Sequence, residues 1–146
     1  SDSYVPPVGP GLWVPTPPAF GKPTYPFWGN NRSFIPGIAA ATQPAAPLAY
    51  SESPKSEFYK AVQELYQNSK NLKLADTITT RFWGDIPGNY SAPTHAANIV
   101  TQLILLKKLS LQEAAILYCK HGIAFSDALI SSFKTKYQYN LLRPVT

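Results

Sequence analysis

Proline is concentrated at one end of this chain. Twelve of the 15 prolines in the 146 residues lie at or before Pro54. Proline lacks a backbone N–H and disfavours helical geometry in the residue that precedes it. Residues 1–52 are therefore predicted to be extended and rich in turns, whereas residues 53–146 are free to form helices.

The proline-rich segment carries apolar anchors that disordered linkers usually lack. These anchors are aromatic side chains: Trp13, Phe20, Tyr25, Phe27, Trp28 and Phe34. The whole chain is 45% hydrophobic and 14% charged, which excludes wholesale disorder because enough apolar surface is available for burial. We expect residues 1–52 to form an ordered arm that packs on the helices. Docking of this arm on a recognition domain of a partner is the alternative.

Apolar residues recur at helical spacing after the arm and predict two first helices. The first begins at Ser53, whose hydroxyl can cap the helix, with Pro54 in the first turn, and it covers about residues 53–69. The second covers residues 74–83. A turn is predicted at residues 85–91.

Capping residues mark the start of two further helices. Thr94 is predicted to cap the third, which runs to about Leu106. Ser110 and Glu113 form a capping box for the fourth, which covers about residues 111–138. At 1.5 Å per residue, this last helix would be about 40 Å long.

The middle of the fourth helix is apolar on every side, a pattern typical of a helix surrounded by neighbours in a bundle. Its apolar residues are Ala115, Leu117, Tyr118, Ile123, Ala124, Phe125, Ala128 and Leu129. Three shorter helices cannot enclose it. The sequence therefore predicts an all-α fold, a helical bundle fragment with a long extended proline-rich N-terminal arm, incomplete at its C-terminus. The single cysteine, Cys119, is predicted to be a small buried hydrophobe.

The net charge of +5 favours anionic ligands. The cations are scattered, however, and no basic stripe interleaved with aromatics is present, so nucleic-acid binding is not expected. The longest uncharged apolar stretch, residues 96–106, is well short of the roughly 20 residues that a transmembrane helix requires.

Two cations near the end of the sequence are the candidate site residues. Lys136 and Arg143 are seven residues apart, close to two helical turns, so a helix would project both from nearly the same face. Pro144 predicts a helix end close to Arg143. A compact ammonium and a planar guanidinium together suit a tetrahedral oxyanion, although two such cations are also common on a solvated face.

A lysine, six residues, an arginine and a proline resemble the first of three signatures of the type-2 phosphatidic acid phosphatase and vanadium haloperoxidase superfamily. Residues 127–137, with an aromatic residue three positions before the lysine, are similar to the haloperoxidase branch. The segments at residues 13–18, 26–29 and 82–85 also look like its bacterial members.

The resemblance implies that Lys136 and Arg143 bind the oxyanion, vanadate in a haloperoxidase and substrate phosphate in a phosphatase, with no direct metal ligand in this chain. It implies a cradle completed by a second arginine, a Pro-Ser-Gly-His segment and a histidine in a Ser-Arg-x5-His segment. The small-molecule substrates would be peroxide and halide, or a phosphate ester. A periplasmic or secreted location is implied by the same branch.

Neither of the later signatures is present in the sequence. His95 is predicted to lie in the first turn of a helix, and His121 to be a hydrogen-bonded core residue. Asp127 lies nine residues before Lys136, so on a continuous helix the two side chains point to opposite sides. Asp127 is therefore expected to pair with a partner other than that lysine. We therefore expect no catalytic residue in this chain and a missing C-terminal portion or companion chain. Formation of a homo-oligomer is an alternative.

Three functions follow as alternatives. The first is a part of a vanadium-dependent haloperoxidase-like enzyme, which the long arm favours by analogy. The second is a phosphatase that uses a phosphohistidine mechanism on the same scaffold. The third is a non-catalytic helical interaction module.

Overall fold

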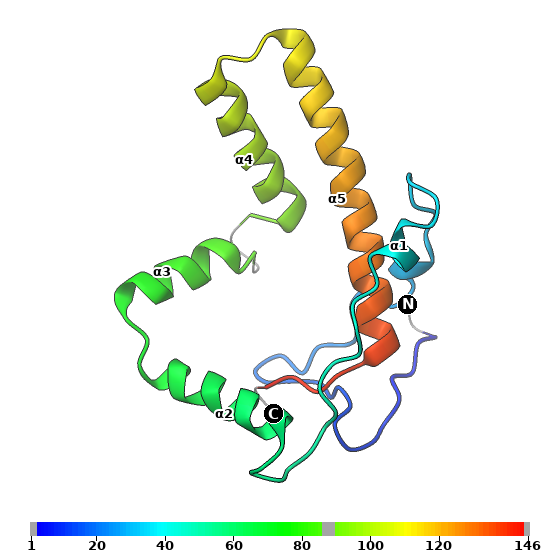
Figure 1. Cartoon of the computed structure of the whole chain (residues 1–146), viewed down its shortest axis with the longest axis vertical. Helices are drawn as coiled ribbons and strands as arrows, with labels where there is room; N and C mark the ends of the chain where they lie inside the picture. The colour runs from blue at the N-terminus through cyan, green and yellow to red at the C-terminus, as the bar shows by residue number, and fades with distance from the viewer. Residues whose placement is uncertain (1–2, 86–89, 145–146) are drawn as a thin grey trace. The chain divides into compact units, whose positions relative to one another are not determined.

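The computed structural model describes residues 3–85 and 90–144 (Figure 1). Within these ranges the secondary structure is helical, and the only β pairing is an isolated antiparallel bridge between Leu12 and Leu141. The elements in chain order are a 3-10 turn η1 (Trp28–Asn30), α1 (Ile38–Ala41), α2 (Glu57–Lys70), α3 (Leu74–Trp83), α4 (Ala92–Lys107) and α5 (Leu111–Tyr139). The predicted all-α fold with an extended N-terminal arm is confirmed.

The backbone forms two compact units. Unit 1 combines residues 1–71 with residues 127–146, so it holds the arm, α2 and the C-terminal part of α5. Unit 2 is the intervening stretch, residues 72–126, with α3, α4 and the N-terminal part of α5. Both candidate cations, Lys136 and Arg143, belong to unit 1.

Two predicted helix starts were wrong. The first helix begins at Glu57 because Ser56, and not Ser53, is its N-cap, with the Ser56 hydroxyl accepting the Tyr59 N–H at 3.1 Å. The third begins at Ala92, so Thr94 lies inside its first turn. In both cases a serine nearer the true start was available, and sequence alone did not rank the competing hydroxyls.

The other helix limits follow the sequence closely. α3 covers the predicted residues, and the start of α5 is fixed by the predicted capping box. The Ser110 N–H donates to Glu113 Oε2 at 2.8 Å, and the Glu113 N–H donates to Ser110 Oγ at 3.3 Å. The Ser110 hydroxyl also donates to Glu113 Oε2 at 2.7 Å, and this bond, together with the one from the Ser110 N–H, lowers the pKa of the Glu113 carboxyl. Most of the predicted turn at residues 85–91 lies outside the described residues.

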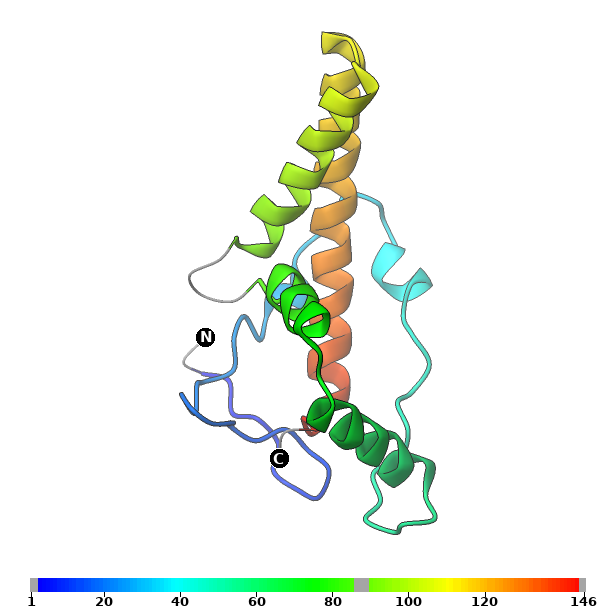
Figure 2. The ribbon, with the colours of Figure 1, turned by 90° about the vertical axis from the view of Figure 1, so that its left-hand side faces the viewer.

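In unit 1 the arm runs beside the C-terminal half of α5 and is attached to it through Asp127 (Figures 1 and 2). The Asp127 side chain is 3% exposed, and its two oxygens accept the backbone N–H groups of Phe34 at 2.7 Å and Ile35 at 2.8 Å. The partner expected for this carboxylate is therefore the arm backbone. Gly29 lets the arm approach still closer, because a Cβ there would lie 2.6 Å from Lys134 Cα.

The arm also pairs with the segment that follows α5. The Trp13 N–H donates to the Asn140 carbonyl at 2.8 Å, and the Leu142 N–H donates to the Gly11 carbonyl at 2.9 Å. The bridge between Leu12 and Leu141 lies between these hydrogen bonds. The Asn140 N–H still donates to the Lys136 carbonyl at 2.9 Å, so Asn140 joins the helix end to the arm, and Leu142 is held by the arm alone.

In unit 2, α4 and the beginning of α5 form an antiparallel hairpin (Figures 1 and 2). Lys108 ends α4 in the left-handed region, with a φ of 51°. The Thr101 and Tyr118 hydroxyls lie 2.7 Å apart and link the two helices. Among the described helices, none is long and apolar enough to cross a membrane.

Large apolar side chains of the hairpin remain exposed. Leu105 is 71% exposed, Leu106 74% and Leu111 87%. Val100 and Ile130 are the only buried hydrophobic residues among those described. Cys119 is exposed, so its predicted burial was wrong: no described segment covers its side of α5.

The Asp127 attachment can be tested by truncating the carboxylate. Asp127→Ala leaves two backbone donors without acceptors and is expected to lower the free energy of unfolding by about 2–5 kcal/mol. Urea unfolding followed by circular dichroism measures this loss. Amide hydrogen exchange of Phe34 and Ile35 should also accelerate.

Glu57→Ala serves as the control because it removes a carboxylate that is 74% exposed and pairs only with Lys60. Its cost is expected to be about 1 kcal/mol at most. Equal losses in the two variants would contradict an anchoring role for Asp127.

Candidate anion-binding site

The chain changes direction between the two candidate cations. Lys136 lies in the last turn of α5, which ends at Tyr139. Asn140 has a φ of 45°, a left-handed conformation that asparagine tolerates better than most residues. Arg143 therefore lies in the non-helical segment beyond α5. The predicted helical face shared by Lys136 and Arg143 was wrong, because the helix ends one turn too early.

The two cations are nevertheless close enough to influence each other. The pKa of Lys136 is lowered from its ordinary value, first by partial desolvation and second by the charge of Arg143. Two neighbouring positive charges favour loss of a proton from the stronger acid of the pair, here the ammonium. Both side chains remain accessible to solvent. This corner of unit 1 thus has two neighbouring cations that an incoming anion can reach.

Aromatic rings flank the Lys136 side chain. Its Nζ lies 5.2 Å from the centroid of the Phe133 ring and 5.3 Å from that of Tyr137, within the range of cation–π attraction. Tyr137 is itself fixed by the arm. Its hydroxyl donates to the Thr24 carbonyl at 2.6 Å, and its ring meets Tyr4 edge-on with centroids 5.2 Å apart.

Arg143 also contacts the arm. Its Nη1 donates to the Thr16 hydroxyl at 3.2 Å. Sequence reasoning found neither the Thr16–Arg143 contact nor the Tyr137–Thr24 contact. Each contact joins an arm residue to one more than a hundred positions away, and no local spacing relates them.

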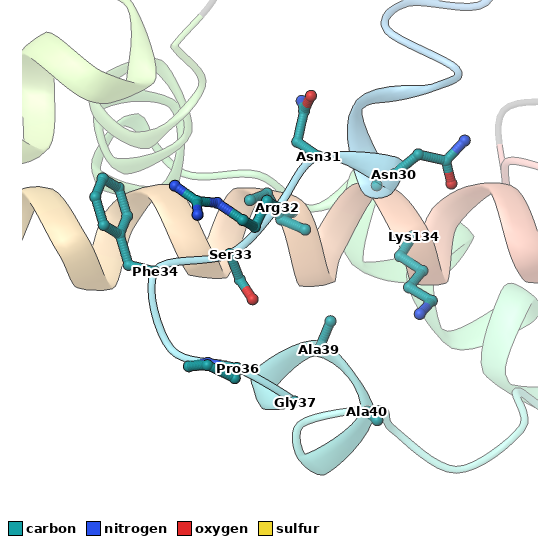
Figure 3. Close-up of a pocket in the computed structure, with 12 residues that line it drawn as sticks. Asn30, Asn31, Arg32, Ser33, Phe34, Pro36, Gly37, Ala39, Ala40 and Lys134 are labelled. Atoms are coloured by element: carbon teal, nitrogen blue, oxygen red, sulfur yellow. The ribbon is translucent and has the colours of Figure 1, made fainter.

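A separate pocket of about 690 Å³ lies between the arm and α5 (Figure 3). Arm residues 29–40 line most of it, and Ile130 and Lys134 line it from the helix. Lys134 is exposed. The side chains of Arg32 and Lys134 point in different directions in Figure 3, so they do not form a common cationic cluster.

His95 is buried in unit 2, in the first turn of α4 as predicted. It is 5% exposed, and its Nδ1 lies 2.7 Å from Asp85 Oδ1. The rings of Phe82 and Trp83 enclose it, with centroids 4.6 Å and 5.3 Å away. Its Nε2 is buried without a hydrogen-bond partner among the described residues. The contact with Asp85 was not predicted.

His121 differs from its prediction. It is half-buried, and its ring lies 5.7 Å from the Phe125 ring on the same helix. No hydrogen bond of His121 is found in the described part of the chain, so it is not a hydrogen-bonded core residue there.

Direct metal ligation finds no support in the described residues. No group of three or more histidine, cysteine, aspartate or glutamate side chains there could hold a metal ion. Lys136 and Arg143 are cations and suit an oxyanion instead.

Comparison with known proteins supports a haloperoxidase-like fold. No protein-family model and no curated protein sequence matches the chain. Among solved structures, the chain is similar to the crystal structure of the first bacterial vanadium-dependent iodoperoxidase, with a TM-score of 0.85 and 30% sequence identity. The match covers 94% of this chain and 36% of that chain, so the chain spans little more than a third of the iodoperoxidase. Membership of the wider superfamily that includes phosphatases stays a prediction.

The electrostatic contact between the two cations leads to a testable prediction. Arg143→Gln removes a neighbouring positive charge, which favours the protonated ammonium, so the pKa of Lys136 should rise towards the ordinary value of 10.5. An NMR titration of the Lys136 side chain measures this shift. Arg32→Gln, which removes a cation that does not influence Lys136, should leave the titration unchanged. An unaltered Lys136 pKa in Arg143→Gln would contradict the proximity of the two charges.

Proposed function

We propose that this chain forms the oxyanion-binding part of a vanadium-dependent haloperoxidase-like enzyme, with Lys136 and Arg143 as ligands of the vanadate oxygens. The observation that carries the proposal is the similarity to the iodoperoxidase over 94% of this chain, at 30% identity. It favours a haloperoxidase over a phosphatase or a non-catalytic interaction module.

The charge distribution of the site supports binding of an oxyanion. Partial desolvation and repulsion from Arg143 both lower the pKa of Lys136, so the charged ammonium is disfavoured in the free site. A tetrahedral anion between the two cations would relieve this repulsion and accept hydrogen bonds from both. A charge-assisted hydrogen bond contributes about 1.5–3 kcal/mol. Two such bonds account for specific binding at an accessible site.

The two residues have distinct roles in this proposal. The Lys136 ammonium neutralises charge on the bound oxyanion, and the Arg143 guanidinium holds two oxygens in a planar fork. When bound, vanadate supplies the activation of peroxide towards halide. The histidine that ligates vanadium and the histidine that acts as acid or base are proposed to come from polypeptide outside these residues, because neither signature occurs in the sequence.

The exposed apolar surface of the α4–α5 hairpin fits the same proposal. Leu105, Leu106 and Leu111 are each more than two-thirds exposed. A bundle enzyme about three times as long would supply neighbours for such a helix pair. A self-contained interaction module, in contrast, would be expected to bury most of these side chains.

Vanadate binding tests the proposed ligands. We expect Lys136→Ala and Arg143→Ala each to weaken vanadate binding by about 10- to 100-fold, the loss of one charge-assisted hydrogen bond. Vanadium-51 NMR measures the affinity, and phosphate competition shows whether the site takes oxyanions as a class. Lys134→Ala is the matched control, since Lys134 is an exposed cation two residues away on α5.

A variant that combines Lys136→Ala with Arg143→Ala provides the baseline. Wild-type protein that binds vanadate no better than this double variant would contradict the proposed ligands. Binding alone does not separate the two enzyme classes. Vanadate-dependent oxidation of iodide by the whole protein supports the haloperoxidase, whereas hydrolysis of a phosphomonoester without vanadate would overturn it in favour of the phosphatase.

The lowered pKa of Lys136 predicts the pH dependence of binding. Only the protonated ammonium attracts an anion, so affinity is fully present below the lowered pKa and falls as pH rises through it. The fall should begin below the ordinary lysine value of 10.5. Sulfate suits this titration, followed by calorimetry, because its own charge does not change over the range. A constant affinity up to that pH would exclude Lys136 as a ligand.

A further inference from the structure

We infer that the N-terminal arm is part of the oxyanion site and that Thr16 is a positioning residue for Arg143. This inference rests on the proposed function for the identity of the ligand. It goes beyond that proposal because it assigns a role to an arm residue that lies 127 positions away from the arginine it contacts.

Arg143 needs an external support because no helix holds it. α5 ends at Tyr139, and the left-handed Asn140 directs the following residues away from the helix axis. Backbone hydrogen bonds of 2.8 Å and 2.9 Å then pair residues 140–142 with residues 11–13 of the arm. This pairing places the start of the next arm segment, at Thr16, beside the Arg143 side chain.

The contact itself suits a positioning role. Thr16 Oγ1 accepts a hydrogen bond from Arg143 Nη1 at 3.2 Å. A guanidinium has five N–H donors in a rigid plane, so one fixed donor sets the orientation of the others. The acceptor is a neutral hydroxyl, which orients the guanidinium without cancelling its charge, as a carboxylate would.

Thr16 is held in place by its own surroundings. It stands between Pro15 and Pro17, and both prolines restrict the backbone at this point. Its carbonyl accepts the Phe20 N–H at 3.0 Å, which closes the following turn. A β-branched side chain has few χ1 rotamers. The Thr16 hydroxyl is therefore a fixed acceptor with little entropy left to lose.

The arm supports the other cation in a parallel way. The Tyr137 ring lies beside the Lys136 ammonium, and its hydroxyl donates to the Thr24 carbonyl at 2.6 Å. Both sides of the site are thus tied to the arm between residues 16 and 24. This shared dependence favours a functional arm over one that merely covers α5.

Three variants test the role of Thr16. Thr16→Val keeps the shape of the side chain and removes the acceptor for Arg143, whereas Thr16→Ser keeps that acceptor. Thr24→Val is the control, because Thr24 contacts Tyr137 through its backbone carbonyl and not through its hydroxyl. We expect the Lys136 pKa to rise in Thr16→Val, because a released Arg143 spends less time beside the ammonium. Vanadate affinity should fall roughly three- to tenfold in the same variant, as for one lost hydrogen bond. Thr16→Ser and Thr24→Val should behave like the wild type.

The two measurements separate the possible failures. A Lys136 pKa in Thr16→Val that equals the wild-type value overturns the positioning role, even if the variant is less stable. Wild-type protein that binds no vanadate overturns the proposed function, whereas the NMR titration of Lys136 still decides whether Thr16 positions Arg143. A raised Lys136 pKa in Thr16→Val, together with a wild-type Lys136 pKa in Thr16→Ser, supports the inference.

Discussion

The buried carboxylate of Asp127 is the interaction on which unit 1 depends. A charged group that is 3% exposed needs hydrogen-bond donors, and the arm supplies two from consecutive backbone N–H groups. Because this attachment fixes the arm against α5, the pairing of residues 11–13 with residues 140–142 has a defined register. That register sets where Thr16 lies, and Thr16 contacts Arg143. Each hydrogen bond in this series, from the buried acid to the surface cation, is 3.2 Å or shorter.

Local signals in the sequence identified the elements but not their junctions. The capping box at Ser110 and the periodicity of residues 74–83 were sufficient to locate α5 and α3, since both depend on neighbours within four residues. The predicted start of α2 was wrong because two serines, Ser53 and Ser56, are both suitable caps. The predicted burial of Cys119 was wrong for another reason. Burial there depends on which segments cover α5, and the sequence around residue 119 does not indicate that.

The candidate site shows the same limit. Its residues, Lys136 and Arg143, could be selected from their spacing and surroundings, and their role as oxyanion ligands stays a prediction. Their arrangement could not be derived, because a left-handed Asn140 and an arm from the other end of the sequence decide it. The contact of His95 with Asp85 was equally beyond reach, as a ten-residue separation matches no regular period.

The pairing of the arm with residues 140–142 has a consequence for biosynthesis. A ribosome makes Thr16 long before Arg143, so the arm must wait, unpaired, while the helices emerge. Extended segments with free backbone donors are prone to pair with the wrong strand during such a delay. A segment in which Pro15, Pro17 and Pro18 have no N–H to offer is poorly suited to that error. The prolines of the arm thus leave fewer backbone donors for such mispairing, and they also favour its extended course.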